Sequence, residues 1–382
     1  MSHRINFVAA AFALTALSYG LARFAYGLLL PQIRADLAIS VTTAGWIGGS
    51  AFAAYCIGIV FTFTGAGKFT PRTLALLAAF AATFGMLLVA LSVSAWLLGA
   101  GIALAGLSTG LTSPPLAFAV SALFCQENRS KANTTINAGT AAGLVICGLA
   151  AWRFADAWRE LYLAFTLVGA AITGWLWFAF PSRITATSAG RMSWAVLKRP
   201  GVFSLCISAF LMGLSSTAVW TFGAEILREK AAFADSGIAL VWIILGASGM
   251  VGALTGVFTH RFGVRPVHVV ALLAMALATA GLVMAALSPV YGFVAMALFG
   301  AAYIVSSGVY LIQGTALFAD RPDLGLGIPF LALALGQAVG NPLFGALLNS
   351  AGVLSALVVF AAIACFALLI RPRSLAESKI EL

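Results

Sequence analysis

The sequence has 382 residues, of which 62% are hydrophobic and only 8% are charged. Soluble domains carry roughly 25% charged residues, and one globular core could not bury this much apolar surface, so the composition excludes a soluble protein. The apolar runs are continuous and rich in Ala, Leu and Gly, which excludes a transmembrane β-barrel, because its strands alternate. The composition therefore predicts an all-α membrane protein with spanning helices of about 20 residues each.

Apolar runs separated by short segments with Pro, Gly and charge predict twelve spanning helices. The expected spans lie near residues 7–30, 42–64, 73–92, 95–122, 134–152, 160–180, 201–225, 237–258, 266–287, 290–317, 326–348 and 352–370. The first run follows a basic residue, as in a secretion signal, but it is too long and lacks a cleavage motif. The longest connection, 181–200, predicts a linker between an N-terminal six-helix bundle (1–180) and a C-terminal one (201–382).

The net charge of +10 would suggest a nucleic-acid partner in a soluble protein, but here the basic residues are scattered over the loops. With the N-terminus in the cytoplasm, the inner segments hold fifteen Lys and Arg residues and the outer loops hold five. This bias predicts a multi-pass protein of the cell (inner) membrane with both termini and the linker in the cytoplasm, and no nucleic-acid partner. The cysteines lack paired spacing, and the histidines lie in or beside the expected inner loops, so no disulfide, metal or cofactor is expected.

A short motif recurs in the two halves of the chain. Lys68–Arg72 and Arg261–Arg265 both read basic-Phe-x-x-Arg, after the second and the eighth expected helix. The fifth and the eleventh expected helices carry glycines at identical spacing. These are Gly139, Gly143 and Gly148 in one helix, and Gly336, Gly340 and Gly345 in the other. Two matches at nearly the same offset indicate an internal duplication and therefore two pseudo-symmetric halves.

These motifs resemble those of the major facilitator superfamily. The repeated loop is similar to the family's signature loop, and Gly336–Gly345 is similar to its glycine-rich helix 5 motif. Glu127–Arg129 resembles the family's acidic-basic pair after helix 4, and Leu28–Leu37 resembles the common end of helix 1. The resemblance implies alternating access and a central cavity lined by helices 1, 4, 7 and 10. The stretch 98–110 holds no charge, unlike helix 4 of drug/proton antiporters.

Arg23 is the one basic residue expected well inside a spanning helix. A charge at the bilayer centre costs about 2.5–3.5 kcal/mol on insertion scales, which favours a position facing water or a ligand. Tyr19, Arg23 and Tyr26 follow i, i+4, i+7 spacing, so we expect them on one face and in the substrate site. The alternative is that Arg23 reaches out of the membrane core or donates to backbone carbonyls.

Helix 10 carries a second polar face. Tyr303, Tyr310 and Gln313 share it by the same spacing, together with Ser306 or Ser307. The resemblance places this helix in the cavity wall, and the alternative is hydrogen bonding between helices. For further candidates, helix packing is favoured over substrate contact: Asn137, Gln337, Trp220 and Tyr55.

Two groups of residues are expected to control gating. By resemblance, helix 5 slides against helix 8 and helix 11 against helix 2 through the glycines of helices 5 and 11, with Gly139, Gly143, Gly336 and Gly340 as the gating candidates. Charged residues on the expected cytoplasmic face are predicted to form ion pairs that close the inner gate in the outward-facing state, and the alternative is that they only fix topology. These residues are Lys68, Arg72, Glu127, Arg129, Arg261, Arg265 and Asp320.

Glu225, near the outer end of helix 7, is the candidate for proton coupling. We expect it at the membrane interface, which favours exchange, uniport, or symport with the proton on the solute's own acidic group. Arg23 together with several hydroxyl groups favours a small organic anion as substrate. The leading interpretation is a monomeric secondary active or facilitative transporter, not an enzyme, that binds a small molecule within membrane lipid. The alternatives are efflux of amphipathic drugs or other lipophilic compounds, and a non-transporting binding protein, for which no motif speaks.

Overall fold

A computed structural model describes residues 2–64, 68–154, 157–181, 198–318 and 322–370. The first part of the chain forms seven α-helices and one π-helix. They are α1 (Ser2–Thr15), the π-helix η1 (Ala16–Phe24), α2 (Ala25–Leu37), α3 (Val41–Thr64), α4 (Pro71–Ala90), α5 (Ala95–Leu123), α6 (Gln126–Arg153) and α7 (Trp158–Ala179). Because α1, η1 and α2 are continuous, they form one long first membrane helix, His3–Leu37.

The second part repeats this plan with more interruptions. Its elements are α8 (Val202–Trp220), α9 (Gly223–Ala231), α10 (Asp235–Gly249), η3 (Met250–Leu254), α11 (Thr255–Phe262), α12 (Val264–Gly281), η4 (Leu282–Ala286), α13 (Pro289–Leu317) and α14 (Pro322–Leu369). Gly352 interrupts α14 with φ 80° and ψ 173°. The described residues contain eleven helices long and apolar enough to span a membrane, and α14 counts once among them although Gly352 divides it. The predicted all-α fold with twelve membrane helices is confirmed.

Several helices begin where the sequence supplies a capping residue. Thr70 accepts a hydrogen bond from the backbone N–H of Thr73, directly before Pro71 opens α4. Ser94 caps α5 in the same way, and Ser288 caps α13 before Pro289. Such caps satisfy backbone donors that the first helical turn leaves free, and proline fits the first position because its N–H is missing. The short turns between the membrane helices are therefore fixed locally.

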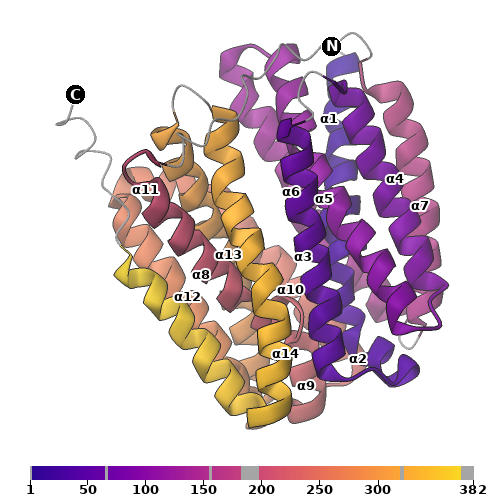
Figure 1. The fold of residues 1–382 in the computed structure, drawn as a ribbon, viewed down its shortest axis with the longest axis vertical. Coiled ribbons are helices and arrows are strands. Elements are labelled where there is room, and N and C mark those ends of the chain that lie inside the picture. Colours follow the sequence, from indigo (N-terminus) through magenta and orange to yellow (C-terminus); the bar gives the residue numbers. More distant parts are fainter. Residues whose placement is uncertain (1, 65–67, 155–156, 182–197, 319–321, 371–382) are drawn as a thin grey trace.

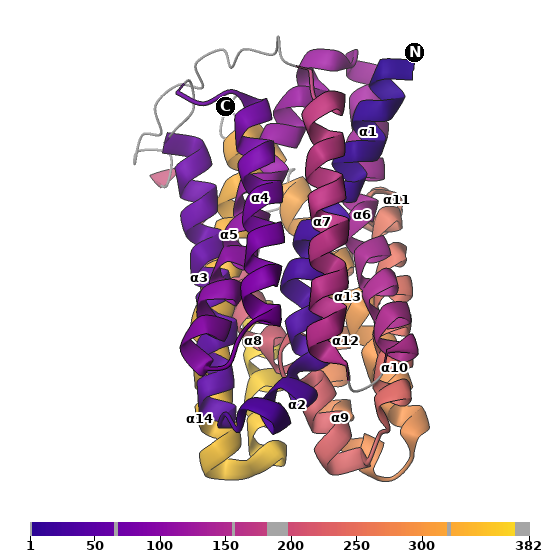
Figure 2. The same ribbon diagram turned by 90° about the vertical axis from the view of Figure 1, so that its right-hand side faces the viewer.

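The two parts of the chain lie side by side as two bundles, with α1–α7 on one side and α8–α14 on the other (Figure 1). Their ribbons diverge toward the end that carries the N-terminus and converge at the opposite end, where α2 meets α9 (Figures 1 and 2). Along their length the bundles touch through α3 against α14 and α6 against α10. These are the helix 2–11 and helix 5–8 contacts that the family resemblance implied. The linker predicted at 181–200 lies mostly outside the described residues.

The outward surface of the bundles is apolar. Phe178 is 86% exposed, Leu277 67% and Phe366 60%. A soluble protein would hide such side chains, whereas lipid tails solvate them. The surface is that of a multi-pass membrane protein.

Candidate functional site

The site begins with an irregularity in the first membrane helix. Tyr19 and Arg23 both lie in the π-helix η1. π-Helical turns are rare and occur frequently at functional sites. Here the turn crosses α6 very closely, because a Cβ atom placed on Gly20 would lie 2.4 Å from the backbone of Gly143. The small residues of η1 therefore let this helix approach α6 closely.

Arg23 lies among four aromatic rings. Its guanidinium carbon is 4.3 Å from the ring centroid of Phe24 and 4.7 Å from that of Phe52. The rings of Tyr55 and Tyr19 follow at 5.2 and 5.3 Å. Cation–π attraction of this kind is worth about 0.5–2 kcal/mol per contact. We call Arg23 and these four rings the aromatic cage.

The guanidinium has no polar partner in the cage. Arg23 is only 7% exposed, and its Nε atom is buried without a hydrogen bond. Within the described part of the chain, no carboxylate forms an ion pair with it. An arginine keeps its charge at every physiological pH and offers five N–H donors in a planar fork. The cage therefore presents a permanent positive charge with unused donors in apolar surroundings, which suits a negatively charged oxygen group.

Aromatic stacking connects the cage to the second bundle. The indole ring of Trp220 stacks on Phe24 with centroids 4.2 Å apart and planes 28° apart. Tyr303 packs edge-on against Trp220 at 5.1 Å. Gln337 donates a hydrogen bond to the Tyr303 hydroxyl at 3.2 Å and another to Ser216 at 3.1 Å.

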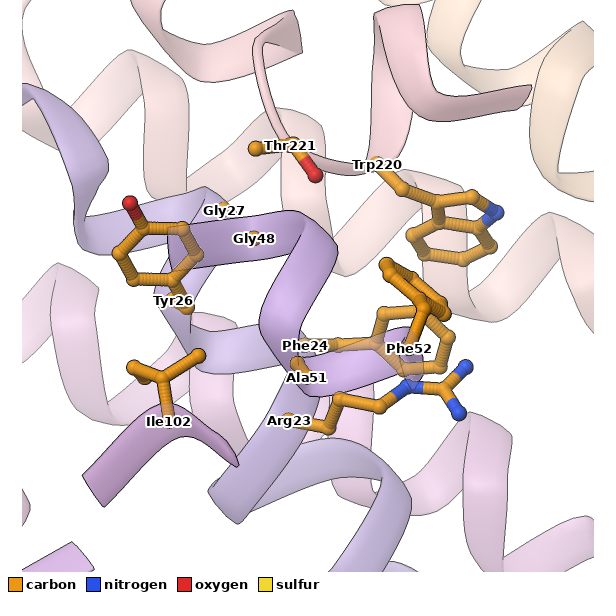
Figure 3. Close-up of a pocket in the computed structure, with 10 residues that line it drawn as sticks. All are labelled: Arg23, Phe24, Tyr26, Gly27, Gly48, Ala51, Phe52, Ile102, Trp220 and Thr221. Atoms are coloured by element: carbon orange, nitrogen blue, oxygen red, sulfur yellow. The ribbon is translucent and has the colours of Figure 1, made fainter. Parts of the chain in front are cut away.

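A small pocket lies between the bundles beside this stack. Figure 3 shows Arg23, Phe24 and Phe52 grouped below Trp220, with the guanidinium pointing away from Tyr26. The structure thus brings together several of the residues predicted to bind substrate. They are Arg23, Tyr19, Tyr55, Trp220, Tyr303 and Gln337. Sequence analysis did not single out Phe24 and Phe52, which carry no signal beyond aromatic character.

Tyr26 lines the same pocket as Arg23, but the polar groups of the two side chains point in different directions. The Tyr26 hydroxyl donates to the backbone carbonyl of Ala44 at 3.0 Å, away from the guanidinium. The i+7 spacing assumes an α-helix of 3.6 residues per turn, whereas a π-helix takes more residues per turn. The residues after η1 are therefore rotated relative to the expected face.

The polar face predicted on α13 divides between two environments. Tyr303 reaches the stack, but the Tyr310 hydroxyl hydrogen-bonds to Ser208 at 2.8 Å inside the second bundle. Ser208 in turn lies 3.3 Å from His268 Nε2. Gln313 is buried with its side-chain oxygen unpartnered, and Asn137 is exposed on α6. For Tyr310, the alternative of hydrogen bonding between helices describes the observed contact.

The gating glycines do not lie where the resemblance implied. A Cβ atom on Gly143 would lie 2.5 Å from the carbonyl of Ala16, and one on Gly139 would lie 2.4 Å from that of Phe12, both in the same bundle. Gly336 and Gly340 likewise face Phe210 and Leu214 of α8. The expectation that these four glycines form the contact between the bundles is therefore wrong.

Gly148 and Gly345, the remaining glycines of the two predicted motifs, do lie in the contact between the bundles, as Gly45 does. Gly148 is five positions beyond Gly143 and so on another side of α6; a Cβ there would lie 3.0 Å from the carbonyl of Ala239 in α10. Between α3 and α14, a Cβ on Gly45 would lie 2.6 Å from the carbonyl of Asn341. The sequence shows the spacing of the family's glycine motif. It does not show which neighbouring helix each glycine faces.

The charged residues predicted at the inner gate stay within their own bundles. Arg72 donates to the carbonyl of Trp177 at 2.6 Å, and Arg129 donates to those of Ser121 and Phe124 at 2.6 and 3.0 Å. Lys68, Glu127, Arg261 and Arg265 are exposed. The described residues form no ion pair between the bundles at this end, and Asp320 lies outside them. Separated charges match the diverging ribbons of this end in Figure 1.

The opposite end does carry ion pairs between the bundles. Arg34 of α2 bonds to Glu225 of α9 and lies 3.4 Å from Glu229. Glu225 is only 3% exposed, so it is buried between helices although it lies beyond the end of the spanning helix Val202–Trp220. Burial raises the pKa of Glu225 to about 7, although the Arg34 charge acts to lower it. Arg34 was not among the predicted site residues, and the available signal was that Arg34 and Glu225 lie near the ends of two helices that the resemblance places around one cavity.

Two bundles that meet at one end and diverge at the other, with a charged site between them, define a membrane transporter of the alternating-access class. The chain matches the family model described as Major Facilitator Superfamily over residues 12–328. The chain belongs to the major facilitator superfamily, and it is a secondary transporter.

Known proteins resemble the chain in sequence and in structure. The purine ribonucleoside efflux pump NepI of Escherichia coli (strain K12) is 25% identical to it over 87% of this chain and 84% of that protein. The crystal structure of the nucleoside transporter NupG superposes with a TM-score of 0.77 at 13% identity, covering 97% of this chain and 98% of the other. A bacterial homologue of the human lysosomal transporter Spinster, in an inward-facing and unoccupied conformation, gives 0.76 at 14% identity, covering 96% of each chain. At these identities the structural matches show the shared fold.

Proposed function

We propose that this transporter carries a small organic anion by alternating access and that Arg23 holds the anionic group. The observation that supports this is the aromatic cage, in which a buried guanidinium has ring contacts but no polar partner among the described residues. A solute carboxylate or a similar group would accept from the planar fork in a bidentate manner, which Lys could not reproduce. The rings of Phe52 and Trp220 would cover the apolar body of the solute.

Each end of the molecule can be assigned to one side of the membrane within this proposal. We assign the end with the N-terminus to the cytoplasm, because fifteen of the basic residues fall on that side and five on the other. The observed state, closed between α2 and α9, is then the inward-facing one. The solute would reach Arg23 from the cytoplasm in this state. It would meet the outer solution once α2 and α9 separate and the other end closes.

A binding screen tests the role of Arg23. Purified protein in detergent is heated with aromatic carboxylates, neutral purine nucleosides or lipophilic cations, since a ligand of the folded state raises the unfolding midpoint. We expect carboxylates to stabilise the wild type, Arg23→Gln to abolish the response, and Arg23→Lys to restore little of it. The control is Arg153→Gln, because Arg153 is exposed and far along α6, and it should respond like the wild type. A full response in Arg23→Gln would rule out the anchor.

A second candidate is export of neutral, nucleoside-like or amphipathic compounds. It is favoured by the sequence similarity to a purine ribonucleoside efflux pump and by the stacked rings of Phe24, Trp220 and Tyr303. Here Arg23 would support the rings and not the solute. Neutral nucleosides would then stabilise the wild type and Arg23→Gln equally, whereas Trp220→Ala would lose the response. Uptake into inside-out vesicles then distinguishes export from exchange.

A further inference from the structure

Three carboxyl groups and two guanidinium groups form a cluster at the end opposite the N-terminus: Glu225, Glu229, Asp235, Arg34 and Arg228. One guanidinium, that of Arg34, serves both Glu225 and Glu229. The neighbouring Arg228 is engaged with Asp235. The carboxyl of Glu225 is 5% exposed as a side chain, and its second oxygen, Oε2, is buried without a hydrogen bond. A buried carboxylate oxygen without a donor is costly, and a proton removes that cost.

Among the described residues that pack against α9, none supplies a second cation to Glu225. α9 packs against α2, η4, α8 and α10. From α2, Arg34 and the Tyr26 hydroxyl face Glu225, and that hydroxyl is committed to Ala44. The η4 segment Leu282–Ala286 is entirely apolar, and α8 carries no charged residue. From α10, Asp235 adds negative charge beside Arg228.

The cluster exists only while the bundles touch at this end. Arg34 belongs to the first bundle and both glutamates belong to the second. When α2 and α9 part during alternating access, Glu225 leaves its burial and meets water. We propose that Glu225 is a proton-binding site formed by closure of this end, so that a proton taken from the adjoining solution stabilises the closed state.

The direction of the effect follows from the two environments. In the closed state, burial raises the pKa of Glu225 from 4.5 to about 7. In the open state a hydrated carboxyl returns toward the ordinary value. The closed state binds the proton more tightly, so acid stabilises it relative to the open state. This stabilisation is complete below the lower of the two pKa values and is lost as the pH rises through 7. The proton enters and leaves on the same side, so it regulates the gate without having to cross the membrane.

The test measures the gate directly. Spin labels are placed on Val93 and Leu287, exposed turn residues of the first and the second bundle, in a background without the five native cysteines. Their distance distribution gives the closed-to-open ratio in detergent or nanodiscs. From about pH 8 to about pH 5.5, that ratio should rise roughly 25-fold in the wild type. Glu225→Gln, which imitates the protonated acid, should stay closed and lose the pH dependence.

Two further variants separate proton binding from a structural role. Arg34→Gln should move the midpoint to higher pH, because the charge that favours the carboxylate is gone. Asp36→Asn is the matched control: Asp36 pairs with Arg159 at the same end but within one bundle, and it should follow the wild type. Opening on acidification would show that the ionised pair locks the gate and would overturn the proposal. An unchanged profile in Glu225→Gln would also overturn it.

Discussion

The indole of Trp220 lies flat against the phenyl ring of Phe24, with ring centroids 4.2 Å apart. Phe24 comes from the first bundle and Trp220 from the second, and the other neighbour of Phe24 is the Arg23 guanidinium. The charge at the proposed solute site and this contact between the bundles are thus one side chain apart. A solute that draws Arg23 from its ring alters the surface on which Trp220 rests, and this gives occupancy a physical route to the gate.

This stack predicts a measurable coupling between the two rings. Phe24→Leu and Trp220→Leu should each lower the closed fraction reported by the Val93 and Leu287 labels. The double variant should lose less than the sum of the two, by about 0.5–1.5 kcal/mol, because the second substitution finds the stack already broken. Strictly additive losses would mean that the rings do not stabilise closure together.

Gly27 should be required for closure of the same end. A Cβ atom at this position would lie 1.9 Å from the Trp220 carbonyl, which backbone atoms cannot accommodate without shifting. Overpacking typically costs about 1–3 kcal/mol, so Gly27→Ala should lower the closed-to-open ratio roughly 5- to 150-fold. Gly281→Ala serves as the control because no atom lies within 4 Å of its added carbon. Wild-type distances in Gly27→Ala would contradict the observed contact.

Two glycines of α6 should behave differently when replaced by leucine. Gly143 packs on Ala16 within its own bundle, so Gly143→Leu should reduce folded protein and abolish binding and transport together. Gly148 faces Ala239 of the other bundle, so Gly148→Leu should preserve solute binding but slow turnover. Monodispersity, ligand-induced thermal shift and proteoliposome flux measure the three properties. Identical profiles for the two variants would show that the spacing between bundles does not limit the cycle.

Tyr310 should contribute to stability, whereas Tyr303 should also affect affinity. Tyr310→Phe removes the hydrogen bond to Ser208, which should cost about 1 kcal/mol of stability while solute affinity stays unchanged. Tyr303→Phe removes the acceptor of Gln337 beside Trp220 and should weaken binding. Equal loss of affinity in both variants would place Tyr310 in the solute site.

Much of the fold could be predicted because hydropathy is a strong and local signal. The spans, the break near residue 352 and the contacts of α3 with α14 followed from apolar runs and from the family's motifs. Arg23 was recognisable because a charge inside an apolar run is rare. These features depend on a few neighbouring residues. They can be predicted even when the rotation of a helix about its own axis is not known.

The missed features depend on partners that are distant in the chain. Glu225 pairs with Arg34, 191 positions away, and the local sequence around either residue does not identify the other as its partner. The hydroxyl of Tyr26 bonds to Ala44 and not toward Arg23, and the composition of the π-helix η1 between the two residues gives no warning of this. The glycines of α6 were recognisable as contact residues, but spacing alone does not name the neighbouring helix.

The turn at Gly352 affects the number of times the chain crosses the membrane. Read without it, residues 327–369 are one unbroken apolar stretch of 43 residues, and a chain of eleven crossings would leave its two ends on opposite sides of the membrane. One glycine with φ 80° folds the stretch back on itself and makes the number of crossings even. A Cβ atom added at this position would meet no atom within 4 Å, so the positive φ and not a lack of space is what favours glycine there.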